Sequence, residues 1–245
     1  MNSKKSTFSG KAATVLFTAI ILTSLSFSSC KKSNSKNTTT AGTVTEQDAA
    51  RATIDAVYPT TGGMVSQLNS SVNIYTNKTI PCSTKKDTTI NGASLTGVNP
   101  SYTYSLSWNY LFDCSAQSLT LNFSGSSSYN GVILSSAGSS SGSFVMTGLL
   151  PDTSQYTFNT TYTSSGTTSA NTGKKVTFTS NINITSTNIV IDKTTQEIVS
   201  GSAAVTVSGA STTGNNFNFA GTITFTGDKK ATLVLNSGIS YALSW

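Results

Sequence analysis

The feature that most constrains the fold is a run of alternating apolar residues that ends at Cys114. Seven alternate positions from Tyr102 to Cys114 are aromatic, aliphatic or cysteine, and mostly Ser, Thr or Asn lie between them. A helix would distribute these positions around its surface, whereas a strand keeps alternate residues on one face. The run therefore predicts a long strand with one apolar face and one polar face.

The same period of two recurs along the rest of the chain. Further runs occupy residues 119–123, 156–162, 176–184, 217–225, 233–235 and 239–245. Between Ile184 and Ile189 the alternation changes face, which predicts a β-bulge or bend near Ser186 to Asn188.

Turn-forming residues separate these runs, and short turns require neighbouring strands to pair antiparallel. The turns are Asn130-Gly131, Pro151-Asp152, Asp192-Lys193, Gly227-Asp228 and Asn236-Ser237-Gly238. The fold class predicted is all-β, an antiparallel meander of about eight to ten strands.

One or two short N-terminal helices precede the strands. Thr45 and Asp48 suit the start of a helix that Pro59 ends, and Met64, Leu68 and Val72 are spaced for a second one. We expect one domain over residues 44–245, with a helical lead-in over 44–75 and the meander over 80–245. Its apolar face must be covered, and a curled sheet, a sandwich or a half-barrel lidded by the helix would each do so.

The N-terminal 29 residues have the layout of an export signal. Lys4, Lys5 and Lys11 precede the uncharged stretch Ala12–Leu25, which is too short for a permanent membrane span. Small serines then lead directly to Cys30.

This ending resembles the lipobox of bacterial lipoproteins, and the chain as a whole resembles small lipoproteins of the Bacteroidota. The resemblance implies that Cys30 is acylated and becomes the mature N-terminus, with residues 30–43 as a flexible tether. The alternative is a free or buried cysteine that happens to follow an apolar run. Lipoproteins of that phylum exported to the surface tend to carry acids after the cysteine. Lys31 and Lys32 therefore favour the periplasmic face of the outer membrane.

Charge and composition argue against nucleic acid as a partner. Without Lys4, Lys5 and Lys11 the formal net charge falls from +6 to +3, and no basic cluster with interleaved aromatic residues remains. Abundant Ser, Thr and Asn with few charges suit an exported β-protein. The expected partners are the membrane, through the lipid, and either an apolar ligand or an envelope protein.

Two cysteines remain, Cys82 and Cys114. In an exported chain a single pair favours a disulfide, and two separate free thiols are the alternative.

Few residues suit catalysis. The chain has no histidine, which excludes His-based triads and His metal ligands. Gly138–Gly142 matches G-x-S-x-G but lies in a Ser/Gly-rich stretch that we expect to be a loop. Most of the nine acids lie near the first helix or in turns, while Asp113 and Asp192 are less easily explained. We predict no catalytic residue, metal or cofactor, and a carboxylate pair acting on glycans is the enzymatic alternative.

The predicted function is a binding or structural module of the cell envelope. One version is a half-barrel carrier that holds a lipid or other apolar ligand beneath the N-terminal helix. Its expected contacts are Tyr104, Leu106, Trp108, Phe217 and Phe219; the alternative is that the aromatic stripe is core. Separately, Asp87-Thr88-Thr89 resembles a short motif that Bacteroidota glycosylate, which makes Thr88 a candidate O-glycosylation site.

Overall fold

The computed structural model describes residues 43–173 and 175–245. Cys30, the signal segment 1–29 and the tether up to residue 42 lie outside the described residues. Within residues 43–173 and 175–245, no helix is both long enough and apolar enough to cross a membrane.

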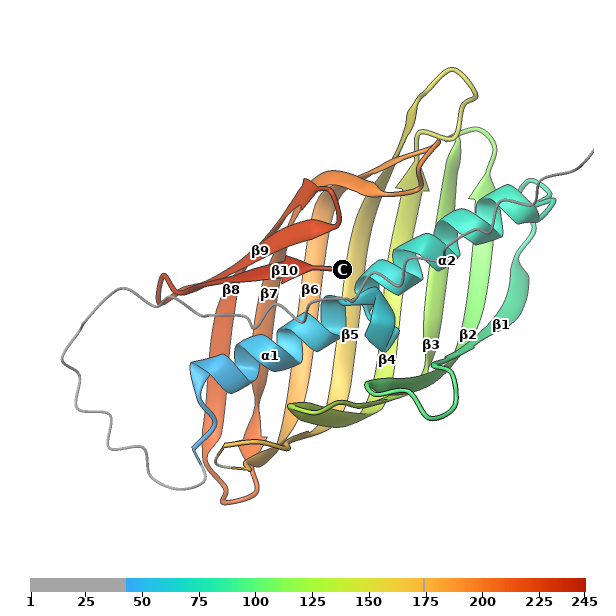
Figure 1. Ribbon diagram of the computed structural model, residues 1–245. Helices are drawn as coiled ribbons and strands as arrows, with labels where there is room; N and C mark the ends of the chain where they lie inside the picture. The colour runs from blue at the N-terminus through green and yellow to red at the C-terminus, as the bar shows by residue number, and fades with distance from the viewer. Residues whose placement is uncertain (1–42, 174) are drawn as a thin grey trace, which may run out of the picture. The chain divides into compact units, whose positions relative to one another are not determined.

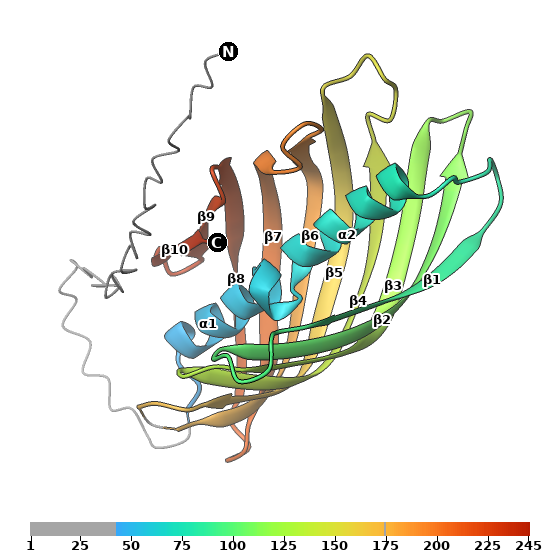
Figure 2. The same ribbon diagram turned by 45° about the vertical axis from the view of Figure 1, so that its right-hand side comes forward.

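Ten strands form a single sheet, in which every strand pairs antiparallel with its neighbours in the chain. The strands are β1 (Lys86–Ala93), β2 (Ser101–Asp113), β3 (Ser118–Asn130), β4 (Leu134–Thr147), β5 (Gln155–Ala170), β6 (Thr177–Asp192), β7 (Ile198–Ser211), β8 (Asn216–Gly227), β9 (Lys230–Leu235) and β10 (Ser240–Ser244). The predicted meander is confirmed. Since β1 and β10 are the two edges, the sheet stays open, and it curls around the helices (Figure 2).

Two helices cross the concave side of the sheet, as Figure 1 shows: α1 (Glu46–Val57) and α2 (Met64–Asn77), joined through the short turn η1 (Pro59–Thr61). The predicted helix start at Thr45 and Asp48 is confirmed and is a capping box: the Thr45 side chain accepts from the Asp48 N–H, and the Asp48 carboxylate accepts from the Thr45 N–H. Helix α1 ends at Val57 with Tyr58 as its C-cap, and Pro59 follows that cap, as expected from its missing N–H.

The apolar faces of sheet and helices form one core. Leu106 and Trp108 on β2 are almost completely buried, as are Val57 on α1 and Leu68 on α2. The rings of Trp108 and Phe123 have centroids 4.5 Å apart. Burying each such side chain contributes about 1.5–3 kcal/mol. The aromatic stripe of β2 is thus largely core, with the helices as its cover.

Three strands were missed by the sequence patterns, namely β1, β4 and β7, and one prediction was wrong. The Ser/Gly-rich stretch Gly138–Gly142 is not a loop but lies inside β4, where it pairs with β3 on one side and β5 on the other. Strand preferences of single residues span only about 1 kcal/mol. Backbone hydrogen bonds to two neighbouring strands therefore decide the conformation in place of local preference.

The predicted bulge is confirmed, because the register between β6 and β7 shifts between Ser186 and Val190. The predicted disulfide is also present. Cys82 and Cys114 are joined, with their Cα atoms 5.5 Å apart. The bridge fastens the segment that follows α2 to the end of β2, where the Ser83 N–H also donates to the Phe112 carbonyl.

Candidate functional site

A row of small residues crosses the concave face of the sheet. It runs across five consecutive strands, and its members stand opposite one another in register: Ser127, Gly138, Gly166, Ser180 and Gly209. They share the face of core residues on the same strands, such as Phe123 and Phe144. We call them the small-residue row. Each of its members is serine or glycine, so the row leaves room between sheet and helix.

Large rings stand at both ends of the row. Tyr104 on β2 is paired with Ser127, and Phe217 on β8 is paired with Gly209. Both rings are partly buried against the core. The row is thus a short trough across the middle of the sheet, limited by an aromatic side chain at each end.

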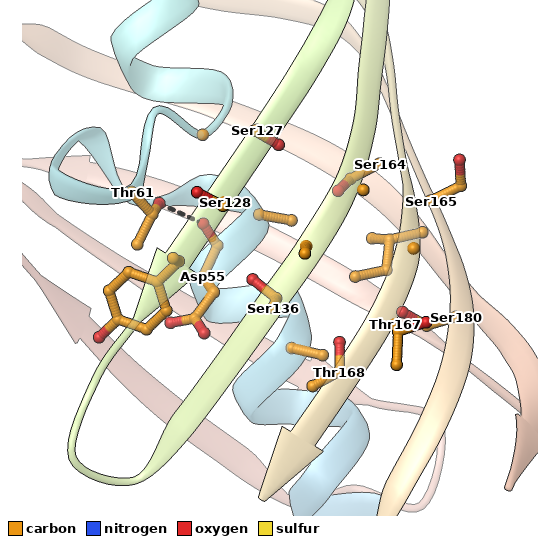
Figure 3. A pocket seen from close by; sticks show the side chains of 18 of the residues that line it. Asp55, Thr61, Ser127, Ser128, Ser136, Ser164, Ser165, Thr167, Thr168 and Ser180 are labelled. Atoms are coloured by element: carbon orange, nitrogen blue, oxygen red, sulfur yellow. Dashed lines mark hydrogen bonds between the residues drawn. The ribbon is translucent and has the colours of Figure 1, made fainter. Parts of the chain in front are cut away.

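A pocket lies where the second half of α1 passes over this trough. Ala52, Asp55 and Ala56 come from α1, at the spacings of three and four that place residues on one side of a helix. The strands β3 to β6 supply the opposite wall, which is rich in hydroxyl groups (Figure 3). The pocket offers about 40 Å³ to water-sized molecules, enough for about three waters at roughly 10–15 Å³ each.

Asp55 is the unusual group in this pocket. Its Oδ2 atom is buried and has no hydrogen-bond partner among the described residues. No Lys or Arg stands among the described residues that line the pocket. Because burial disfavours the charged form, the pKa of Asp55 is raised from 3.8 to about 7. The carboxyl group therefore changes charge near neutral pH, while an ordinary surface aspartate is already ionised.

Hydroxyl groups on the sheet line the same pocket as this carboxyl group. Figure 3 shows Ser136, Ser164, Thr168 and Ser180 around the pocket with Asp55. A serine or threonine hydroxyl can donate one hydrogen bond and accept two. The pocket can therefore hold a polar group that has several hydrogen-bonding atoms.

Two tyrosines complete the polar lining. Burial raises the pKa of Tyr162 to about 12, partly offset by hydrogen bonds with Ser140 and Ser164. Burial also raises the pKa of Tyr129, and the negative charge of Asp55 adds to that rise. Both phenols stay protonated at neutral pH, so they offer hydrogen bonds and no charge.

The turn after α1 fixes the position of Asp55. The Thr61 hydroxyl donates to the main-chain carbonyls of Asp55 and Tyr58, the latter at 2.7 Å. Gly62 follows with φ of +73°, and a Cβ there would lie 2.4 Å from the Tyr104 ring. Glycine is thus required both by the backbone angle and by the close ring. These contacts fasten the end of α1 to β2 and the pocket.

The residues predicted to contact an apolar ligand do not form one site. Leu106 and Trp108 are buried in the core beneath the helices. Tyr104 and Phe217 stand at opposite ends of the small-residue row, and Phe219 lies further along β8. Strands β2 and β8 are six positions apart in the sheet, or about 29 Å along the curled sheet at roughly 4.8 Å per strand. The predicted contacts therefore lie on well-separated strands, and two of them are core.

Asp113 and Asp192, the acids that sequence left unexplained, stabilise turns. Asp113 Oδ1 accepts from the N–H groups of Ser115 and Ala116, and these hydrogen bonds lower its pKa. Asp192 Oδ1 does the same for Thr194 and Thr195, with its pKa lowered too. Both carboxylates are exposed at turns, outside the pocket. Thr88, the candidate glycosylation site, lies on β1, where its hydroxyl receives a hydrogen bond from Lys78 Nζ at 3.0 Å.

Sequence reasoning missed Asp55 and the small-residue row. One signal was present, because Asp55 falls three residues after Ala52, a spacing that places the two on one side of the first helix. Glycines inside strands also mark places where another backbone comes close. The row itself needed the register of five strands, which no local pattern contains.

Comparisons with protein-family models, curated proteins and solved structures found no match for this chain. In residues 43–173 and 175–245, no group of three or more His, Cys, Asp or Glu side chains is placed to hold a metal ion. The function must therefore be argued from the pocket itself.

Proposed function

We propose that this chain is an exported binding module, anchored to the outer membrane through a lipid on Cys30. The pocket between α1 and the small-residue row is its binding site, and the ligand is a small polar molecule or the polar end of a larger one. The observation that carries the proposal is the carboxyl group of Asp55, whose Oδ2 atom is buried without a hydrogen-bond partner among the described residues.

The argument rests on the cost of that group. A carboxylate removed from water without a partner is strongly disfavoured, and proteins normally pair such a group or leave it exposed. The neighbours of Asp55 that also face the pocket from α1 are Ala52 and Ala56. An alanine or leucine at position 55 would serve the packing of α1 better. A costly polar group in a pocket is typical of a functional site.

Binding is favoured over catalysis by the number of acids at the site. Hydrolysis of a glycosidic bond by carboxylates requires two of them, roughly 5–10 Å apart. Asp55 is the one carboxyl group among the described residues that line the pocket. Hydroxyl groups alone would position a ligand and would not supply the second acid.

The anchor follows from the N-terminal pattern. Lysines, an uncharged stretch and Ser28-Ser29-Cys30 occur in the order of a lipoprotein signal. A lipid on Cys30, followed by a polar tether, would hold the domain near the membrane on its periplasmic face.

A lipid carrier is the second candidate, because the sheet is open and its concave side is covered by helices (Figure 2). Beneath those helices, however, the side chains of Leu106, Trp108 and Leu68 fill the core. An acyl chain would require α1 and α2 to move away from the sheet. This candidate therefore predicts a large conformational change on binding.

Native mass spectrometry of the full chain, extracted from membranes in mild detergent, tests the two candidates. The binding module predicts a small co-purifying molecule that is reduced in Asp55→Asn and retained in the control Asp152→Asn, an exposed turn residue. A co-purifying lipid that persists in Asp55→Asn would favour the carrier. A protein with no bound molecule in any preparation would contradict both.

A further inference from the structure

We propose that the pocket binds a primary ammonium group, which forms an ion pair with Asp55 and donates hydrogen bonds to the surrounding hydroxyls. The inference rests on the proposed function and deepens it by naming the chemical class of the ligand.

Charge is the first argument. The described lining contains one group that becomes negative near neutral pH and no group that becomes positive. On α1, Arg51 lies one turn before Asp55, but its guanidinium group approaches Asp48 at 4.0 Å. A cationic ligand would supply the charge that the protein does not provide for Asp55. A neutral ligand would leave a buried carboxylate without compensation.

The match of hydrogen-bond donors and acceptors is the second argument. An ammonium group has three N–H donors and no acceptor, as in lysine. The pocket presents the unpartnered Oδ2 of Asp55 together with the hydroxyls of Ser127, Ser164 and Ser180, each able to accept. One carboxylate and two hydroxyls would satisfy all three donors.

The single carboxylate also argues against a divalent metal ion. Calcium and magnesium are bound mostly by several carboxylate and carbonyl oxygens. With Asp55 alone, a divalent ion would keep an excess positive charge in a buried place. A monovalent cation is neutralised by one carboxylate.

Size limits the substituents on the nitrogen. Space of about 40 Å³ for water-sized molecules corresponds to about three waters. An ammonium group with one or two carbon atoms fits, and any larger part of the ligand must leave through the mouth of the pocket. A quaternary ammonium group is too bulky and has no N–H to donate.

The pH dependence of binding follows from the groups that face the pocket. The titratable ones are Asp55, from α1, and Tyr129 and Tyr162, from β3 and β5, and the two phenols stay neutral below pH 9 because their pKa values are raised. Binding therefore requires only that Asp55 be ionised. With the Asp55 pKa at about 7, the ionised fraction and hence the affinity fall about tenfold from pH 8 to pH 6.

The test is calorimetric titration of the purified full chain with methylammonium chloride at pH 6 and pH 8. We expect saturable binding that weakens about tenfold at the lower pH. Asp55→Asn should weaken it at least tenfold at pH 8, whereas the matched exposed change Asp152→Asn should leave it unaltered. Tetramethylammonium should not bind. Ser127→Val, which reduces the space and keeps the carboxyl group, should also weaken binding.

Three results would overturn the assignment. They are equal binding by wild type and Asp55→Asn, equal binding of tetramethylammonium, or potassium chloride binding as tightly as methylammonium. If Asp55→Asn does not fold, the effect of Ser127→Val on methylammonium binding and the pH dependence of binding by the wild type still test the assignment. A neutral co-purifying molecule seen by native mass spectrometry would refute the ammonium group and leave the binding module standing. If no molecule co-purifies and methylammonium does not bind, both the ammonium ligand and the binding module are refuted.

Discussion

Gly138 on β4 and Gly166 on β5 lie directly opposite each other, and neither position has room for a side chain. A Cβ on Gly138 would come 2.0 Å from the Ser165 carbonyl oxygen, and one on Gly166 would come 2.3 Å from that of Ala137. Glycine pairs of this kind let a sheet bend sharply toward one face. Both glycines belong to the small-residue row and line the pocket, so the close approach of β4 and β5 and the space of the pocket depend on the same residues.

The first prediction concerns this glycine pair. Gly166→Val should lower the free energy of unfolding by about 1–3 kcal/mol or more, because the backbone of β4 must move away. Thr167→Val is the matched control, since Thr167 is exposed on the opposite face of the same strand, and it should change stability by less than about 0.5 kcal/mol. Urea denaturation measures both. Equal effects of the two substitutions would show that the close approach does not limit this position.

The second prediction concerns the pH dependence of stability. The pKa of Asp55 is higher in the folded state than its ordinary value, so folding favours the protonated form. The stabilisation is complete below pH 4 and is lost as pH rises to about 7. The rise from 3.8 to about 7 corresponds to roughly 4 kcal/mol at about 1.36 kcal/mol per unit.

Urea denaturation between pH 4.5 and pH 8 checks this. Wild type without ligand should lose stability across that range, while Asp55→Asn should lose far less and should be the more stable protein at pH 8. Asp113 and Asp192, whose pKa values are lowered, titrate below this window and do not obscure it. Parallel pH profiles for the two proteins would contradict a buried Asp55.

The third prediction concerns the disulfide. Cys82 and Cys114 are 32 residues apart in sequence, and closing a loop of that length stabilises a protein by roughly 3–4 kcal/mol in the chain-entropy model. The double variant Cys82→Ser/Cys114→Ser should therefore unfold at lower urea concentration. Reductant should reproduce the effect in wild type and have none in the variant. Peptide mapping under non-reducing conditions that finds both thiols free would contradict the bridge.

The fourth prediction concerns the anchor. A fatty-acid analogue supplied to cells should label the wild-type protein and fail to label Cys30→Ala. The mature wild type should begin at Cys30 by mass spectrometry and should fractionate with the outer membrane. Equal labelling of the two proteins, or a mature N-terminus elsewhere, would rule out lipidation at this cysteine.

Local patterns determined much of the fold. The alternation in β2 predicted a strand whose aromatic residues are core, and the change of face after Ile184 predicted the bulge that the register of β6 and β7 contains. The capping box of Thr45 and Asp48 and the pairing of Cys82 with Cys114 were also predicted. Each of these depends on residues close in sequence or on a choice among very few partners.

Other features were decided only by tertiary structure. Alternation showed that β2 has an apolar face, but it could not show whether a second sheet, closure or helices would cover that face. Gly138 and Ser140 have little strand preference of their own, and they become strand because β3 and β5 offer hydrogen bonds on both sides.

The candidate site shows the same limit most clearly. The sequence determined that Asp55 lies on the first helix and that glycine and serine interrupt the strands. The register of β3 to β7 places those small residues in one row, and the path of α1 brings Asp55 over it. Burial of Asp55, and with it the raised pKa, arises because residues far apart in the chain line one pocket, such as Asp55 and Ser180, which are 125 positions apart. Local sequence could not reveal the raised pKa of Asp55, because the cost of burying a charge depends on the groups that surround that charge in space.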